Sequence, residues 1–415
     1  MVGEPSTLFS LLVGLSLVLV VAHGLGLLAD RLGSAPVVGE LLTGLVLGPS
    51  VLGVLAPGVV AVVLPVPAGL AAFASVGLVL LLVLAGTEVD VSAFRQSLRP
   101  AVALATGAFV VPFLAGVALG WWLPARYLVS PAGRLPFALF LGTALSISAV
   151  PVALRVLVDL DALDLRVGQL TLTVAVAVDA VGWVALSVVA EVARGGGVDP
   201  LGVGRTVFAL LGFVAVVTVL GPRLVGPLFA ATERVRSPAI TGFSIVVVLG
   251  LGAAAVSTAL GLEPVLGAFL AGALARNRLG AEAERVFHVA TLGLFAPLFF
   301  ATAGLRADLG GILTPRAALV AGVALLVAIL GKFLGVALGA AFTDLSNTET
   351  VCLAIGLNAR GAMEIVVAAL GLAIGVFTPV VYAVVVLVAI VTSVMPPPRL
   401  WRALTRLPSE STVAV

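Results

Sequence analysis

TLTVAVAVDAVGWVALSV, residues 171 to 188, is an apolar run of helix length with one acid, Asp179, near its middle. A run of this length can cross a bilayer. A charged carboxylate at bilayer depth costs roughly 2.5 to 3.5 kcal/mol on insertion scales, so such an acid is rare unless it faces a cavity or a partner. Asp179 is therefore the first candidate for chemistry.

The second candidate is Lys332, the only lysine among the 415 residues. It lies inside another apolar run, LLVAILGKFLGVALGA, residues 325 to 340. The scarcity of lysine is a compositional bias, but retention of one lysine inside a span is informative. Cys352 is also alone, so no internal disulfide can form and we expect it to serve packing.

The composition places the chain among polytopic membrane proteins. Hydrophobic residues make up 61% and charged residues 10%, whereas a soluble domain carries about 25% charge. The net charge of +2 comes from loops and tail, where basic residues set orientation, so we expect no nucleic-acid partner. We find no Walker motif, dinucleotide loop, metal cluster or nucleophile with its base, which argues against an enzyme and against a cofactor.

Thirteen apolar segments are separated by charge, proline or glycine, and twelve spans remain the alternative because the eighth and ninth segments are divided by only a few residues. The segments are 8–28, 36–55, 69–85, 100–119, 136–157, 165–190, 205–220, 238–260, 262–275, 289–305, 317–342, 351–370 and 377–394.

The basic residues predict the orientation of these spans. With thirteen spans, fourteen arginines fall on one side and six on the other, while Lys332 and Arg360 lie within spans. The positive-inside rule then places the N-terminus outside and the C-terminus in the cytoplasm. We expect a bacterial plasma membrane.

Two predicted spans are interrupted. The fifth has Ser146, Ser148 and Pro151 in its middle, and the twelfth has Arg360 and Glu364 within CLAIGLNARGAMEIVVAALGL, residues 352 to 372. Proline frees a backbone carbonyl, which hydrocarbon tolerates only beside protein or water. The two spans are seven apart and therefore cross in opposite directions. Such a pair in two inverted halves indicates a transporter's midplane site.

Seven motifs in chain order resemble the monovalent cation:proton antiporter family, which includes bacterial Kef-type exchangers and plant cation/H+ exchangers. The motifs are PVVGELLTGLVLGPSVLG (36–53), LAGTEVD (84–90), ALSISAVPVALRVL (144–157), VAVDAVGW (176–183), APLFFATAGLRADL (296–309), LGKFLG (330–335) and LNARGAMEIVV (357–367).

The resemblance implies an all-α membrane fold of inverted repeats, with two crossed, broken helices in a core that moves against a dimerisation panel. The expected divisions are 1–95 and 233–310 for the panel, 96–190 and 311–398 for the core, 191–232 for a linker helix and 399–415 for a cytoplasmic tail. It also implies a homodimer that exchanges Na+ or K+ for H+.

By position, Asp179 matches the family's ion-binding aspartate and Lys332 a lysine of a core helix. Ser146 and Ser148 fall in the first unwound helix, and Arg360 and Glu364 match the charged pair of the second. The residue before the aspartate is usually Asp or Asn in the family and is Val178 here.

The chemistry expected of these residues is competition between a proton and a cation at Asp179, the cation being held also by Ser146, Ser148 and freed carbonyls. We expect Lys332 to pair with Asp179. The alternative is a bond from Lys332 to a carbonyl exposed by a broken helix.

We expect structural roles for two further sets of charged residues. Arg360 and Glu364 are four residues apart and are expected to neutralise each other. Glu40 is expected to be a buried anchor.

The function predicted is secondary antiport of Na+ or K+ against H+. One alternative is a channel-like K+ efflux pathway. The other is an organic-solute carrier or a non-transporting sensor in which Asp179 and Lys332 form a fixed pair.

Overall fold

The structure is a computed structural model that describes residues 7–32, 35–55, 68–88, 98–129, 133–193, 200–235, 237–305, 309–312 and 314–406. These residues are almost entirely helical, with one isolated β-bridge between Leu128 and Phe377. Part of the predicted tail, 407–415, and parts of two motifs, 89–90 and 306–308, lie outside the described residues.

The α-helices of the first half are α1 (Thr7–Arg31), α2 (Pro36–Leu47), α3 (Leu52–Leu55), α5 (Ala68–Glu88), α7 (Leu98–Trp122), α8 (Arg134–Ser146), α9 (Val150–Asp159) and α10 (Arg166–Ala193). Those of the second half are α11 (Pro200–Ala230), α12 (Pro238–Ala259), α13 (Pro264–Ala275), α14 (Ala281–Ala290), α15 (Ala296–Leu305), α16 (Pro315–Ala340), α17 (Asn347–Leu357), α18 (Ala362–Ala373), α19 (Pro379–Val394) and α20 (Pro396–Leu404). A π-helical turn, Thr291–Phe295, joins α14 to α15.

Eleven helical segments of the described chain are long and apolar enough to cross a membrane. The remaining two of the thirteen predicted spans fall on α13, which is short, and on α17 and α18, which are two helices separated by a break. The chain is thus a multi-pass membrane protein, and the span count is near the predicted thirteen.

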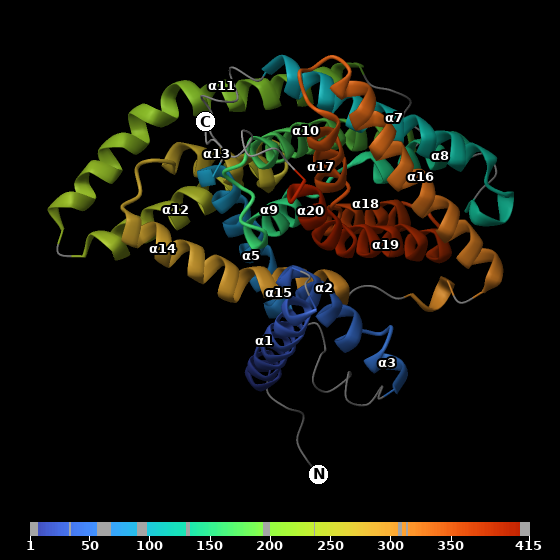
Figure 1. Cartoon of the computed structure of the whole chain (residues 1–415), viewed down its shortest axis with the longest axis horizontal. Helices are drawn as coiled ribbons and strands as arrows, with labels where there is room; N and C mark the ends of the chain where they lie inside the picture. Colours follow the sequence, from blue (N-terminus) through green and yellow to red (C-terminus); the bar gives the residue numbers. More distant parts are fainter. Residues whose placement is uncertain are drawn as a thin grey trace, which may run out of the picture.

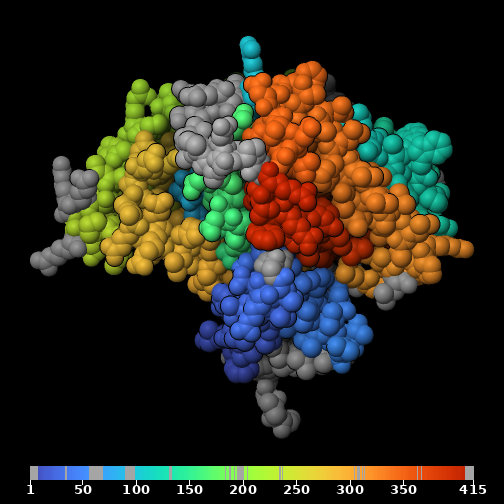
Figure 2. Space-filling view, viewed as in Figure 1, coloured from blue at the N-terminus to red at the C-terminus, as the bar shows by residue number. Residues whose placement is uncertain are grey.

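Helix α11, with 31 residues, follows one edge of the molecule. Figure 1 shows α11 running along the edge opposite α1 to α3, between the side of α12 and α14 and the side of α7 and α8. Figure 2 shows the last helices, in red, in the middle of one face, with the blue N-terminal helices projecting below them. Apolar side chains such as Phe208 of α11, which is 79% exposed, suit contact with lipid.

Helices α7 and α16 pack closely through glycine. A Cβ atom added to Gly335 of α16 would lie 2.2 Å from the carbonyl oxygen of Gly107 on α7. Small residues let membrane helices approach until their backbones touch. This contact sets the position of Lys332, three residues earlier on α16.

A buried ion-pair cluster joins α2 to α9. Arg155 Nη2 lies 2.8 Å from Glu40 Oε1, and Arg155 Nε lies 3.3 Å from Asp159 Oδ1. Asp159 Oδ2 also accepts a hydrogen bond from the backbone N–H of Val37, at 3.2 Å. Glu40 is therefore the buried anchor that its sequence position predicts.

Candidate functional site

The two broken spans meet at their breaks. Between α8 and α9 the chain is extended at residues 147 to 149, and between α17 and α18 it is non-helical at residues 358 to 361. The backbone N–H of Ala149 donates to the carbonyl of Ala359 at 2.9 Å, and Ser148 Oγ donates to the carbonyl of Leu357 at 2.9 Å. The breaks are thus paired with each other inside protein, as unwound backbone at membrane depth requires.

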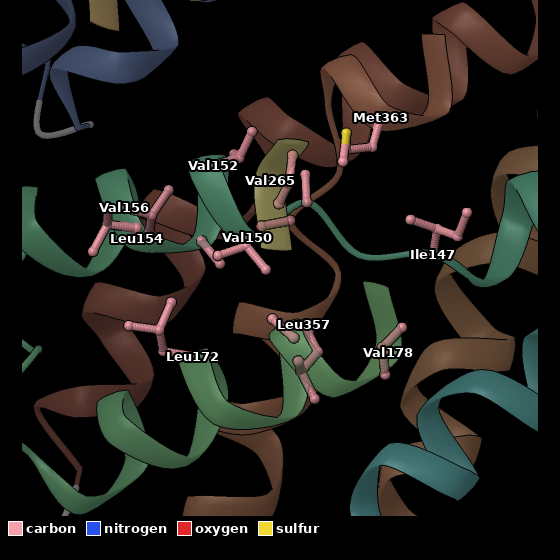
Figure 3. Packing of buried hydrophobic residues seen from close by; sticks show 14 of the residues in the cluster. Ile147, Val150, Val152, Leu154, Val156, Leu172, Val178, Val265, Leu357 and Met363 are labelled. Carbon is pink, nitrogen blue, oxygen red and sulfur yellow. The ribbon is translucent and has the colours of Figure 1, made fainter. Parts of the chain in front are cut away.

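Local sequence explains where each span breaks. Pro151 is at the start of α9, where its missing N–H costs nothing, and the preceding Ala149 has extended dihedral angles. In the second break, a Cβ atom on Gly361 would lie 2.6 Å from Cγ2 of Val152. Glycine is therefore needed where the second span passes α9. Figure 3 shows the extended chain at Ile147 close to this crossing.

Lys332 is fully buried and its three N–H donors have three acceptors. Nζ donates to the carbonyls of Ala108 (3.0 Å) and Ser146 (2.5 Å) and to Ser148 Oγ (3.0 Å). The Ala108 carbonyl lacks its helical partner because the residue four positions on is Pro112. The Ser146 carbonyl lacks its partner because α8 ends there. Lys332 therefore satisfies carbonyls that two helix interruptions release.

The predicted ion pair between Lys332 and Asp179 is wrong for this structure. No nitrogen–oxygen distance between the two side chains falls within 4 Å, although the charges are close enough to interact electrostatically. The alternative, a bond from the lysine to carbonyls exposed by a broken helix, is the observed one. The physical reason is that freed carbonyls offer the ammonium a full set of partners without requiring Asp179 to approach.

Arg360 and Glu364 form the predicted ion pair, although Arg360 lies in the break and not on a continuous helix. Arg360 Nε lies 3.8 Å from Glu364 Oε1, and Arg360 Nη2 donates to the carbonyl of Ala328 at 3.2 Å. Glu364 Oε2 accepts the N–H of Gly361 at 2.7 Å and so caps α18. Both side chains are buried, and each neutralises the other.

Asp179 is 3% exposed, and neither of its carboxylate oxygens has a hydrogen-bond partner of normal geometry among the described residues. The backbone of Val150, the first residue of α9, interacts electrostatically with the carboxylate. The side chain lines a cavity of about 80 Å³ between α10, α11 and the turn that joins α12 to α13. An unpaired buried carboxylate beside a cavity is available to a proton or a cation.

Ser146 and Ser148 lie at the crossing but do not bond Asp179. Ser146 Oγ donates to the carbonyl of Thr143 at 2.9 Å, and Ser148 Oγ is held between Leu357 and Lys332. In the described conformation the two hydroxyls therefore position the breaks and the lysine. Their predicted role as cation ligands stays a prediction.

Val178 and Asp179 face different surroundings. Val178 is fully buried among apolar residues at the crossing. Figure 3 shows it on α10, to the right of Leu357 and below Ile147. Gly182, one turn later, would place a Cβ atom 2.6 Å from Ile147 Cγ1. This face of α10 is thus an apolar packing surface, while Asp179, one residue round the helix, faces the cavity.

Sequence reasoning missed one acid of this cavity, Glu263. It lies in the turn between α12 and α13, and it lines the same cavity as Asp179. It falls at the start of the ninth predicted segment, 262–275, directly after the eighth, but nothing in the sequence shows that the turn folds against α10.

Comparisons with known proteins agree on one family and one fold. The sequence model of the family described as "Sodium/hydrogen exchanger, transmembrane" matches residues 15–401. The chain is 28% identical to the Na(+)/H(+) antiporter NhaS4 of Synechocystis, over 95% of this chain and 97% of that protein. It is 26% identical to the Na(+)/H(+)-K(+) antiporter GerN of Bacillus cereus, over 93% of this chain and 94% of that protein.

A plant relative is longer. The chain is 30% identical to the Cation/H(+) antiporter 15 of Arabidopsis thaliana over 92% of its own length, but it spans about half of that protein, 47%. Among solved structures, the sodium proton antiporter MjNhaP1 of Methanocaldococcus jannaschii matches 96% of this chain and 98% of that chain, with a TM-score of 0.66 and 18% identity. That likeness concerns the fold.

Proposed function

This chain belongs to the sodium/hydrogen exchanger family, and we propose that it exchanges a monovalent cation, Na+ or K+, for H+ with Asp179 as the group that binds either ion. The observation that carries the proposal is the Asp179 carboxylate, which is buried and unpaired beside a cavity at the crossing of two broken spans.

One carboxylate is sufficient for obligatory exchange. A protonated Asp179 offers no charge to a cation, and a cation on the carboxylate excludes the proton, so the two ligands compete for one site. Each buried charge nearby already has a partner: Arg360 has Glu364, and Lys332 has three oxygens. At the crossing of the two breaks, Asp179 is thus the described buried charge without a hydrogen-bond or ion-pair partner, and its charge is left for the transported ion to balance.

The proposed transport motion is a movement of one set of helices against another. In the proposed cycle, the core (96–190 and 311–398) carries Asp179 and moves against the panel (1–95 and 233–310) on either side of the linker helix (191–232). The protein is proposed to act as a homodimer in a bacterial plasma membrane, with its N-terminus outside and its C-terminus in the cytoplasm.

Dequenching of a pH-sensitive dye in everted membrane vesicles tests this function. Na+, K+ and Li+ are added in turn. At least one of them should dissipate the proton gradient, to an extent that saturates with cation concentration. Cation flux that follows its own gradient with no proton movement would establish a channel instead. Absence of both cation and proton flux, with binding of an organic solute, would establish the remaining rival.

A further inference from the structure

We propose that Glu263 is a second cation-binding carboxylate, which captures a partly hydrated monovalent cation at the mouth of the cavity and passes it to Asp179. The inference rests on the proposed function of Asp179 and adds a second acid that lines the same cavity. Asp179 belongs to α10 of the proposed core, whereas Glu263 belongs to the α12–α13 turn of the proposed panel.

The charge of the cavity favours a cation. Among the described residues that line it, Asp179 and Glu263 are the ionisable ones, and no lysine, arginine or histidine is present. The other lining side chains are apolar apart from Thr206, whose hydroxyl donates to the carbonyl of Gly202 at 3.1 Å. A cleft of one charge sign with low-dielectric walls concentrates ions of the opposite sign.

The Glu263 carboxylate makes no hydrogen bond or ion pair with the described residues. Glu263 precedes the first residue of α13, but its side chain makes no capping hydrogen bond, and only its backbone carbonyl is engaged, by Ser257 Oγ at 2.5 Å. No lysine, arginine or histidine among the described residues that line the cavity neutralises this carboxylate. The carboxylate is therefore available to a cation that enters the cavity.

The depths of the two acids give an order of events. Gly261, at the same turn, is exposed, Glu263 is half-buried and Asp179 is almost fully buried. About 80 Å³ holds several water molecules, so a cation can keep part of its hydration shell between the two carboxylates. Carboxylate and water oxygens are suitable ligands for hard cations. A cation entering by the turn thus meets Glu263 before Asp179.

Glu263 and Asp179 share a cavity only while Asp179 is accessible from one face of the membrane. The turn follows the eighth predicted span, which the arginine distribution places outside. When the core moves against the panel, Asp179 leaves the wall that carries Glu263. The effect of Glu263 should therefore be confined to cation offered from the outer face.

Transport kinetics in vesicles of both orientations test this inference. The half-saturating cation concentration is measured with cation added to right-side-out or to everted vesicles that contain the full chain. In Glu263→Gln it should rise about tenfold at the outer face, the low end of what charged clefts give, and stay within about twofold at the cytoplasmic face. Glu263→Asp should keep the wild-type value, and Glu282→Gln, which removes an exposed acid of α14 on the cytoplasmic side, is the control for loss of one negative charge elsewhere.

A charge-restoration experiment avoids dependence on how Glu263→Gln folds. In a Cys352→Ala background, Glu263→Cys is modified after insertion by a negatively or a positively charged methanethiosulfonate. The negative reagent should give the lower half-saturating concentration at the outer face. Equal values for the two reagents, or wild-type values for Glu263→Gln at both faces, would overturn the role of Glu263. If the wild-type protein shows no cation-dependent exchange, the proposed function itself is overturned.

Discussion

Replacement of Lys332 distinguishes a structural lysine from one that regulates Asp179. Lys332→Met removes all three hydrogen bonds at nearly constant volume and leaves the carbonyls of Ala108 and Ser146 buried without a donor. An orphaned buried polar group costs about 1 to 3 kcal/mol, while hydrogen bonds between membrane helices average about 0.6 kcal/mol. We expect a loss of about 2 to 5 kcal/mol for Lys332→Met, and about half as much for Lys332→Gln, whose amide can still donate twice.

Lys332→Gln should move the pH dependence of exchange only slightly. A contact ion pair shifts the titration of its acid by about 1 to 3 pH units, whereas a more distant cation acts more weakly. Since Lys332 does not contact Asp179, we expect the pH optimum of Lys332→Gln to rise by less than about one unit.

Detergent melting curves and dye dequenching across pH measure the two quantities on one preparation. Leu334→Met, on the exposed side of the same helix, is the control for stability. Unchanged stability with a pH optimum moved by more than one unit would refute this reasoning and restore the Lys332–Asp179 pair.

The remaining predictions concern packing, the buried ion pairs and topology. Gly335→Val should destabilise the protein by about 1 to 3 kcal/mol, because a side chain there collides with the Gly107 carbonyl, and it should lower the yield of monodisperse protein in size-exclusion chromatography. Arg155→Met should cost about 3 to 5 kcal/mol in thermal unfolding, because two acids then lose their buried partner; a wild-type melting curve would contradict this. A cysteine introduced at Ser411 in a cysteine-free background should react only with reagents that reach the cytoplasm, and labelling from outside would reverse the proposed topology.

The apolar periodicity and the interruptions of the spans predicted much of the fold. Pro151 and Gly361 mark the two breaks, and charge at midspan singles out Asp179, Lys332, Arg360 and Glu364 from the sequence alone. These features are predictable because hydrocarbon penalises each unpaired polar group so strongly that such groups are rare outside sites.

The partners of those groups were harder to predict. Lys332 bonds backbone carbonyls, and the sequence does not encode which freed carbonyl a distant side chain will reach. The Ser146 hydroxyl donates to the Thr143 carbonyl of its own helix. Serine often makes such local hydrogen bonds to the backbone in place of bonds to distant groups. Glu263 reaches the cavity only because the α12–α13 turn packs beside α10, a contact between distant segments that no local pattern announces.

Asp179→Asn in purified, reconstituted protein tests the central claim most directly. The amide keeps the volume of the carboxylate but can neither release a proton nor carry the negative charge that holds a cation. In proteoliposomes we predict no cation-dependent proton movement at any pH, with an elution profile and melting curve close to those of the wild type. Cation-dependent dequenching that persists in this variant would contradict the assignment of Asp179.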